Sequence, residues 1–253
     1  MSTRLLNPAI LALRERITQL EGDGARTREV LPFSVPVLDR RLPGGGLALG
    51  CLHEVAGGGN GAVDGAAAAC FVAGIAARTQ GKVLWCVAQQ DLFAPGLEQA
   101  GLSADRVIHV EAGDEKLVLA CMEEGLRHGG LGAVVADIAR LPMTASRRLH
   151  LAAKESGTIG IALRRWRRQA EASDFGQPTA AMTRWRVSVV PSQQLPVPGV
   201  GRARWLIELI RARAGEPLDI ELEACDGSGH LRLPAHMAGG PVAAEDSRHS
   251  AAG

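Results

Sequence analysis

The sequence contains no tyrosine, and phenylalanine and tryptophan contribute only four residues each to a chain of 253. Aromatic side chains are therefore too few to fill an interior, and the core has to be built mainly from aliphatic residues. Hydrophobic residues make up 46% of the chain and charged residues 22%, close to globular averages, which excludes disorder of the whole chain. The length allows one large domain, or one domain with appended segments.

An excess of charge of one sign is also missing. Lysine and arginine together number 28 and the acidic residues 27, so the formal net charge is +1. This balance excludes a globally basic nucleic-acid-binding protein, although it leaves room for a local basic face. Lysine itself is scarce, since only Lys82, Lys116 and Lys154 are present.

Long apolar runs, a signal peptide and paired cysteines are all lacking. No apolar stretch reaches the roughly 18 residues of a membrane span, and residues 1–20 lack the apolar block of a signal peptide. The five cysteines show no CxxC spacing, and the seven histidines form no HxxxH or HxH pair. We therefore expect buried thiols in a reducing compartment, a cytoplasmic location with no membrane contact, and no metal site.

The N-terminal segment carries a short apolar stripe. Ile10, Leu13, Ile17 and Leu20 recur every three or four positions, which predicts an amphipathic helix. We assign residues 1–32 to this helix and a linker, residues 33–237 to a core domain, and residues 238–253 to a disordered tail.

The middle of the chain alternates between strand-like and helix-like segments. A strand at Cys51–Val55 leads through the glycine-dense turn Gly57–Gly61 into a helix at Gly65–Ala77. Such alternation is typical of a parallel sheet with crossover helices. The further strands expected are Lys82–Ala88, Val107–Glu111, Ala133–Ile138 and Gly160–Leu163, and the further helices are Leu97–Leu102, Glu115–His128 and Thr144–Glu155.

After Arg168 the pattern changes to strands without helices between them. In Thr183–Val190 polar and apolar residues alternate, the period of a half-buried strand. Arg204–Arg213, Leu218–Ala224 and Leu231–Leu233 are also strand-like, so we expect an antiparallel extension of the sheet. The predicted fold class is α/β: a mostly parallel sheet flanked by helices, with antiparallel C-terminal strands.

This order of landmarks resembles the RecA-like fold from about Phe33 to Leu233. The chain is more closely similar to the ImuA proteins, RecA-like products of bacterial damage-inducible mutagenesis cassettes. The shared features are the N-terminal helix, the segment FSVPVLDRRLPGGGLALGCLHEV at residues 33–55, and an arginine- and tryptophan-rich C-terminal half. In RecA-like proteins a helix ahead of the core docks on an adjacent protomer, so the resemblance implies that the N-terminal helix docks on another chain, its own or a RecA-like partner.

The glycine turn departs from a working phosphate loop, whose pattern is GxxxxGK[ST]. If Gly57 opens the motif, Val63 stands at the lysine position and Asp64 at the hydroxyl position. By the resemblance, Gln89 replaces the glutamate that orients the attacking water, whereas Asp137 matches the aspartate that holds Mg²⁺. A degenerate nucleotide site with no cofactor and no catalytic residue is predicted, either a relic turn or a site of weak residual nucleotide binding, formed by Gly57, Gly58, Gly59, Gly61, Val63, Asp64, Gln89 and Asp137.

Positive charge is concentrated between Arg164 and Arg213. This segment holds ten arginines against three acidic residues, a net charge of +7, with Trp166, Trp185 and Trp205 among them. Arginines with interspersed aromatics suit single-stranded DNA, because arginine meets phosphate and tryptophan stacks on bases. A protein-binding surface and a solvated strand face over core tryptophans are the alternatives. The candidate DNA or partner contacts are Arg164, Arg165, Trp166, Arg167, Arg168, Arg184 and Arg186.

The resemblance implies a non-catalytic accessory protein in SOS-induced translesion synthesis. Its implied partners are an ImuB-type polymerase-like protein, a DnaE2-type error-prone polymerase, RecA and single-stranded DNA. Two alternatives stay open: a DNA-stimulated RecA-like ATPase or recombinase, and a cell-division inhibitor resembling SulA.

Overall fold

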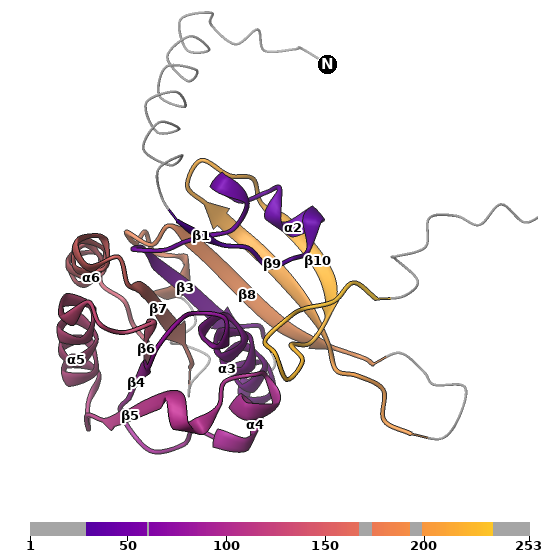
Figure 1. Cartoon of the computed structure of the whole chain (residues 1–253), viewed down its shortest axis with the longest axis horizontal. Coiled ribbons are helices and arrows are strands. Elements are labelled where there is room, and N and C mark those ends of the chain that lie inside the picture. The colour runs from indigo at the N-terminus through magenta and orange to yellow at the C-terminus, as the bar shows by residue number, and fades with distance from the viewer. Residues whose placement is uncertain (1–28, 60, 167–173, 193–198, 235–253) are drawn as a thin grey trace, which may run out of the picture.

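The computed structural model describes residues 29–59, 61–166, 174–192 and 199–234 (Figure 1). The predicted N-terminal helix with Ile10, Leu13, Ile17 and Leu20 lies outside the described residues, as do Arg167, Arg168 and the predicted tail.

One eight-stranded sheet organises the described chain, in the order β10-β9-β8-β3-β7-β6-β4-β5. The strands from β3 to β8 run parallel, β9 is antiparallel to β8, and β10 is antiparallel to β9. The expected α/β class with antiparallel C-terminal strands is therefore confirmed. The strands are β3 (Leu52–Gly57), β4 (Val83–Val87), β5 (Val107–Glu111), β6 (Ala133–Ile138), β7 (Ile159–Arg164), β8 (Thr183–Val190), β9 (Arg204–Ala212) and β10 (Leu218–Glu223).

Helices cover the two faces of this sheet. On one face α3 (Gly61–Ala77) contacts β3, β7 and β8, with α4 (Ala94–Gln99) beside it; on the other, α5 (Glu115–His128) and α6 (Met143–Ser156) pack together over the parallel strands (Figure 1). No helix among the described residues has the length and apolar character to cross a membrane. The smaller elements are β1 (Val30–Leu31), α2 (Pro36–Asp39), η1 (Pro43–Gly45), β2 (Leu47–Ala48) and η2 (Ala104–Arg106).

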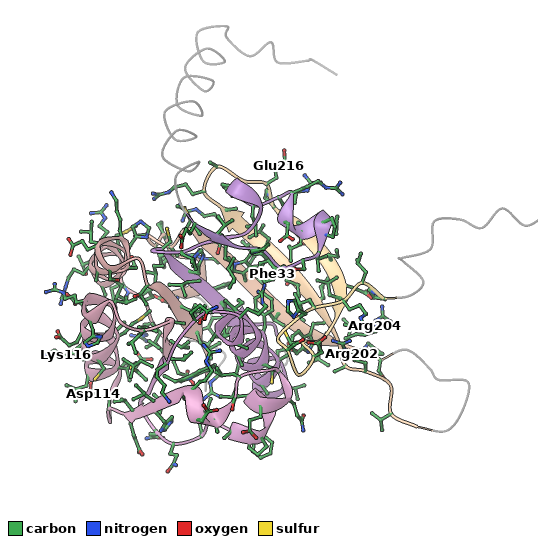
Figure 2. All side chains as sticks on the ribbon, viewed as in Figure 1. Phe33, Asp114, Lys116, Arg202, Arg204 and Glu216 are labelled. Atoms are coloured by element: carbon green, nitrogen blue, oxygen red, sulfur yellow. The ribbon has the colours of Figure 1, made fainter. Side chains whose placement is uncertain are left out.

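Helix α5 begins and ends at residues suited to cap it. Asp114 accepts the backbone N–H of Leu117 at 2.9 Å, which satisfies a free donor at the start of α5. Gly129 ends the same helix at φ 71°, a left-handed conformation that glycine adopts without strain. Figure 2 shows Asp114 and Lys116 at the outer end of α5, away from the sheet.

Alternate residues of the central strands pack into two separate hydrophobic cores. In β4, Trp85 packs in the core under α3, while Cys86 packs in the core under α5 and α6. Phe33 lies fully inside the first core (Figure 2), where its ring stacks on Phe71 at 5.8 Å and tilts against Trp185 at 5.4 Å. Three of the eight aromatic residues thus meet at one point of this core, and aliphatic side chains make up most of the rest.

The structure differs from the predicted elements in three places. The expected strand at Leu231–Leu233 is only a single bridge between Glu223 and Arg232. The helix expected from Gly65 begins at Gly61, and the turn-rich connector contains the two-stranded sheet β1–β2. Two-residue strands give no alternation that a sequence pattern could reveal.

Candidate functional site

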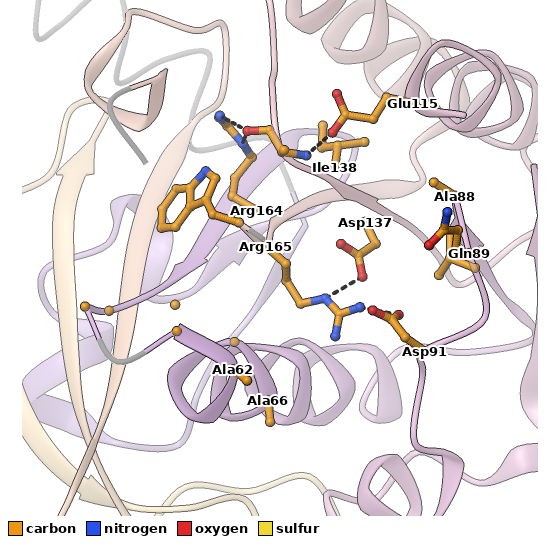
Figure 3. A pocket seen from close by; sticks show the side chains of 18 residues that line it. Ala62, Ala66, Ala88, Gln89, Asp91, Glu115, Asp137, Ile138, Arg164 and Arg165 are labelled. Carbon is orange, nitrogen blue, oxygen red and sulfur yellow. Dashed lines mark hydrogen bonds and ion pairs between the residues drawn. The ribbon is translucent and has the colours of Figure 1, made fainter. Parts of the chain in front are cut away.

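A cavity of about 810 Å³ opens at the carboxyl ends of the parallel strands. In open parallel sheets this edge is where ligands bind, because neighbouring crossovers diverge there. The structure brings the glycine turn, Gln89 and Asp137 together around this cavity, as the sequence predicts. The residues that line it include Gly57, Gly58, Gly59, Gly61, Ala62, Gln89, Asp91, Glu115, Asp137, Arg164, Arg165 and Trp166 (Figure 3).

The glycine turn is packed against the protein on one side. The N–H of Gly58 donates to the carbonyl of Val187 at 2.9 Å, so this amide is already used. A Cβ on Gly57 would lie 2.8 Å from the backbone nitrogen of Gly65, and one on Gly58 would lie 2.1 Å from Ser188 Oγ. These glycines are required by close approach to α3 and β8, which is a structural role.

Neither Val63 nor Asp64, the residues aligned with the lysine and the hydroxyl of the motif, lines the cavity. The side chain that faces the cavity from the first turn of α3 is Ala62, with Ala66 one turn later (Figure 3). Val63 is 51% exposed and does not line the cavity. Helix α3 starts at Gly61, so the first side chain that it directs at the cavity is the methyl group of Ala62, and its first turn offers no cation to a phosphate there.

Asp64 also lies away from the cavity. Its carboxylate is 2% exposed and accepts the N–H of Val189 at 2.9 Å, so it ties α3 to β8. The residue assigned to a missing hydroxyl is therefore a structural acceptor. Lys82 lies at the opposite end of β4 from the cavity, where its Nζ donates to the carbonyl of Asp105 at 2.5 Å.

Arg165 occupies the centre of the charged part of the cavity. Its Nε donates to Asp137 Oδ2 at 2.6 Å, and its Nη2 pairs with Asp91 (Figure 3). Burial lowers the pKa of Arg165, but the charges of Asp137 and Asp91 outweigh that effect and raise it above its usual value. The aspartate at the Mg²⁺ position is thus paired with a cation from its own chain.

A buried ionic network lies beneath the same strand ends. Glu54 on β3 is fully buried and pairs with Arg164, and also with Arg184 at 2.9 Å. Thr179 donates to Glu54 at 2.9 Å, and Arg164 pairs with Asp174 at 2.6 Å. Breaking such a network leaves an uncompensated buried charge, typically at a cost of about 3–5 kcal/mol.

Arg164 and Arg184 are therefore not accessible contacts for DNA or a partner, contrary to the sequence prediction. Both are buried because Glu54 and the ring of Phe175 hold them; the Arg184 guanidinium lies 5.1 Å from that ring centroid. Trp166 packs edge-on against Phe175 at 5.5 Å, so its ring is already engaged. Glu54, a charged residue within the apolar strand segment CLHEV, could have predicted this network from the sequence, because a buried charge needs partners.

The positive charge of the arginine segment is largely compensated in space. Arg186 pairs with Glu208 at 3.3 Å, and Arg202 and Arg204 pair with Glu223 and Glu221 of β10. Carboxylates from outside the segment account for most of these pairs, which a count along the sequence could not show. Figure 2 shows Arg202 and Arg204 at the end of the antiparallel strands opposite Glu216.

Metal and thiol chemistry find no support in the described part of the chain. No group of three or more metal-ligating side chains occurs there. None of the five cysteines forms a disulfide, and burial raises the pKa of Cys86 and Cys225 to about 12, which keeps both thiols protonated.

Comparisons with protein families, with curated proteins and with solved structures each find similarities. The family described as the cell division inhibitor SulA matches residues 75–160. The RadB recombinase structure superposes with a TM-score of 0.54 at 18% identity, covering 80% of this chain and 98% of that one, which confirms the RecA-like fold. Protein ImuA of Caulobacter vibrioides, in strains NA1000 / CB15N and ATCC 19089 / CIP 103742 / CB 15, is 39% identical over 239 residues, covering 88% of this chain and 97% of the relative. This chain therefore belongs to the ImuA family, the RecA-like proteins of bacterial damage-inducible mutagenesis cassettes.

Proposed function

We propose that this protein is a non-catalytic, cytoplasmic accessory protein in damage-induced translesion synthesis. The observation that carries the proposal is the charge of the cavity. Asp91, Asp137 and Glu115 line it together with Arg164 and Arg165, so its charged lining side chains carry one net negative charge. Both arginines are already paired with carboxylates of the chain, Arg164 with Glu54 and Asp174, and Arg165 with Asp91 and Asp137. A triphosphate needs cations around it, and Ala62, the first side chain of α3 in the cavity, supplies none.

Gln89 stands where the resemblance places the base of the hydrolytic step. Gln89 lines the cavity after β4, and an amide can position water but cannot accept its proton at neutral pH. A RecA-like domain that does not turn over nucleotide is suited to hold partners together, because its surface does not change through a hydrolysis cycle. We expect an ImuB-type polymerase-like protein, a DnaE2-type polymerase and RecA as those partners.

Hydrolysis is tested with the pure full-length protein, Mg²⁺-ATP and single-stranded DNA. We expect phosphate release at buffer background for the wild type and for Asp137→Asn alike. In cells that lack the protein, Gln89→Ala should restore damage-induced mutation as well as the wild type does. DNA-stimulated ATP turnover that Asp137→Asn removes would instead establish the ATPase or recombinase alternative.

A SulA-like role is the second candidate, and the match of residues 75–160 to that family favours it. This range runs from the end of α3 to the start of β7, which is only part of the described core. Binding assays with purified candidates separate the two roles. Capture of the ImuB-type protein, without capture of the tubulin-like division protein, is the result expected of an accessory factor.

A further inference from the structure

The ion bridge around Arg165 joins three elements that are distant in the sequence. Asp137 is the penultimate residue of β6, Asp91 follows β4, and Arg165 directly follows β7. One guanidinium contacts both carboxylates, through Nε to Asp137 at 2.6 Å and through Nη2 to Asp91. The ends of three neighbouring parallel strands are therefore held by a single side chain.

Because its surroundings are partly buried, this bridge should contribute more to stability than an ion pair on the surface. The side chains of Asp137 and Arg165 are 10% and 22% exposed, so solvent screens their contact only partly. Asp91 is 48% exposed and lies at the mouth of the cavity. Without a cation, two carboxylates would face one another at the edge of a buried sheet, which is unfavourable.

The direction of Arg165 is set by β7. Arg164, the last residue of the strand, is buried with Glu54 and Asp174, whereas Arg165 reaches into the cavity. The successive residues Arg164 and Arg165 thus form ion pairs with different sets of carboxylates. The buried network anchors the end of β7 and thereby fixes where the second guanidinium can reach.

We propose that Asp91 and Asp137 form a cation site whose resident cation is the guanidinium of Arg165. Asp137 is the residue that, by the resemblance, matches a Mg²⁺-holding aspartate, so the bridge supplies that carboxylate with a cation from within the chain. It holds the ends of β4, β6 and β7 in one arrangement without metal or nucleotide. This inference rests on the proposed function in one respect, since a protein that bound Mg²⁺-ATP would need the position vacant.

The test replaces the resident cation and offers an external one. Arg165→Gln removes the charge and retains a polar side chain, so the melting temperature in metal-free buffer should fall by about 2–4 °C or more. Millimolar MnCl₂ should recover at least half of that loss, because carboxylate oxygens suit Mn²⁺. The wild type should show no response to Mn²⁺, and neither should Arg165→Gln/Asp137→Asn, which lacks one of the two ligands.

Arg186→Gln is the matched control, because it removes a partly exposed arginine paired with Glu208 on β9, away from the cavity lining. It should melt close to the wild type and ignore Mn²⁺. Arg165→Lys is the second variant if the glutamine variant does not fold; its single nitrogen cannot match the two-nitrogen bridge, so we expect a smaller loss and a smaller Mn²⁺ response.

Three results would overturn the proposal: an Arg165→Gln variant that melts with the wild type, a destabilised variant that Mn²⁺ does not rescue, or a wild type that Mn²⁺ or Mg²⁺-ATP stabilises as strongly as the variant. These melting experiments are independent of damage-induced mutation. The cation site can therefore fail while the accessory role stands, and the reverse also holds.

Discussion

At the scale of single residues, buried polar groups in the central strands determine much of the chemistry of this fold. His53 on β3 is 1% exposed and contacts the carbonyl of Ala48 through Nε2 at 2.9 Å. A carbonyl only accepts, so Nε2 carries the proton and Nδ1 accepts from the hydroxyl of Thr183 at 2.7 Å. The indole N–H of Trp185 donates to the same hydroxyl at 2.6 Å, which completes a buried chain of hydrogen bonds.

His53 should make the protein sensitive to mild acid. Burial lowers its pKa from 6.5 to about 4, with the charge of His150 contributing. The unfolded chain therefore takes up a proton at higher pH than the folded one. Stability is full above pH 6.5 and falls as the pH drops toward 4, by about 3 kcal/mol for this group.

Urea unfolding of the wild type and of His53→Gln at several pH values measures this effect. We expect the variant to be less stable at neutral pH but to lose less stability on acidification. Parallel pH profiles for the two proteins would contradict the assignment of His53 as a buried neutral side chain.

At the scale of elements, α3 is the helix on which the first core depends. Its residues are mostly alanine, glycine and other small side chains, which lets the helix approach β3 and β8 closely. Gly74 faces Cys225 so closely that a Cβ would lie 2.4 Å from the sulfur. Phe71 is the large side chain of this helix that joins the cluster with Phe33 and Trp185.

We therefore expect Phe71→Ala to destabilise the protein strongly, by about 3–5 kcal/mol, because it empties the centre of that cluster. Phe93→Ala is the matched control, since Phe93 is 71% exposed and its loss should change stability by less than about 0.5 kcal/mol. Chemical denaturation of both variants checks the difference, and comparable losses would mean that the cluster does not hold α3.

Sequence patterns predicted elements well where the pattern was long. Val83–Val87 and Ala133–Ile138 are apolar runs bounded by turn signals, and both are central parallel strands. The failures came where contacts distant in the sequence decide the outcome. The start of α3 at Gly61 depends on packing of the glycine turn against β8, which no local pattern contains.

At the scale of the whole molecule, spatial charge pairing matters more than charge along the chain. The glycine turn, Gln89 and Asp137 line one cavity, as expected from the sequence, because the carboxyl ends of parallel strands meet at one edge of a sheet. The sequence could not reveal that Arg165 pairs with Asp91 and Asp137, since these three residues lie at the ends of three different strands. Arg164 and Arg184 were misassigned for the same reason.

Binding of single-stranded DNA, if the arginine segment provides it, should depend on Arg167 and Arg168, because Arg164, Arg165 and Arg184 are held by carboxylates. The double variant Arg167→Ala/Arg168→Ala should reduce the salt slope of binding by about 0.7 for each phosphate that the protein no longer neutralises. Arg147→Ala/Lys154→Ala removes two exposed cations of α6 and serves as the control.

Fluorescence anisotropy of a labelled oligonucleotide over a range of salt concentrations measures both variants. An unchanged affinity and slope in the first variant would exclude this segment as the DNA site. The same variant should then be examined for loss of the ImuB-type partner.

The position of β8 has a consequence for how the chain is made. β3 lies between β7 and β8, so one edge of this buried strand is covered only by residues 183–190. During synthesis the strands from β3 to β7 leave the ribosome before β8. Until β8 follows, the backbone N–H and C=O groups along one edge of β3 have no strand to pair with. An uncovered apolar edge invites pairing with another nascent chain. Prompt arrival of the C-terminal strands therefore protects the newborn protein from aggregation.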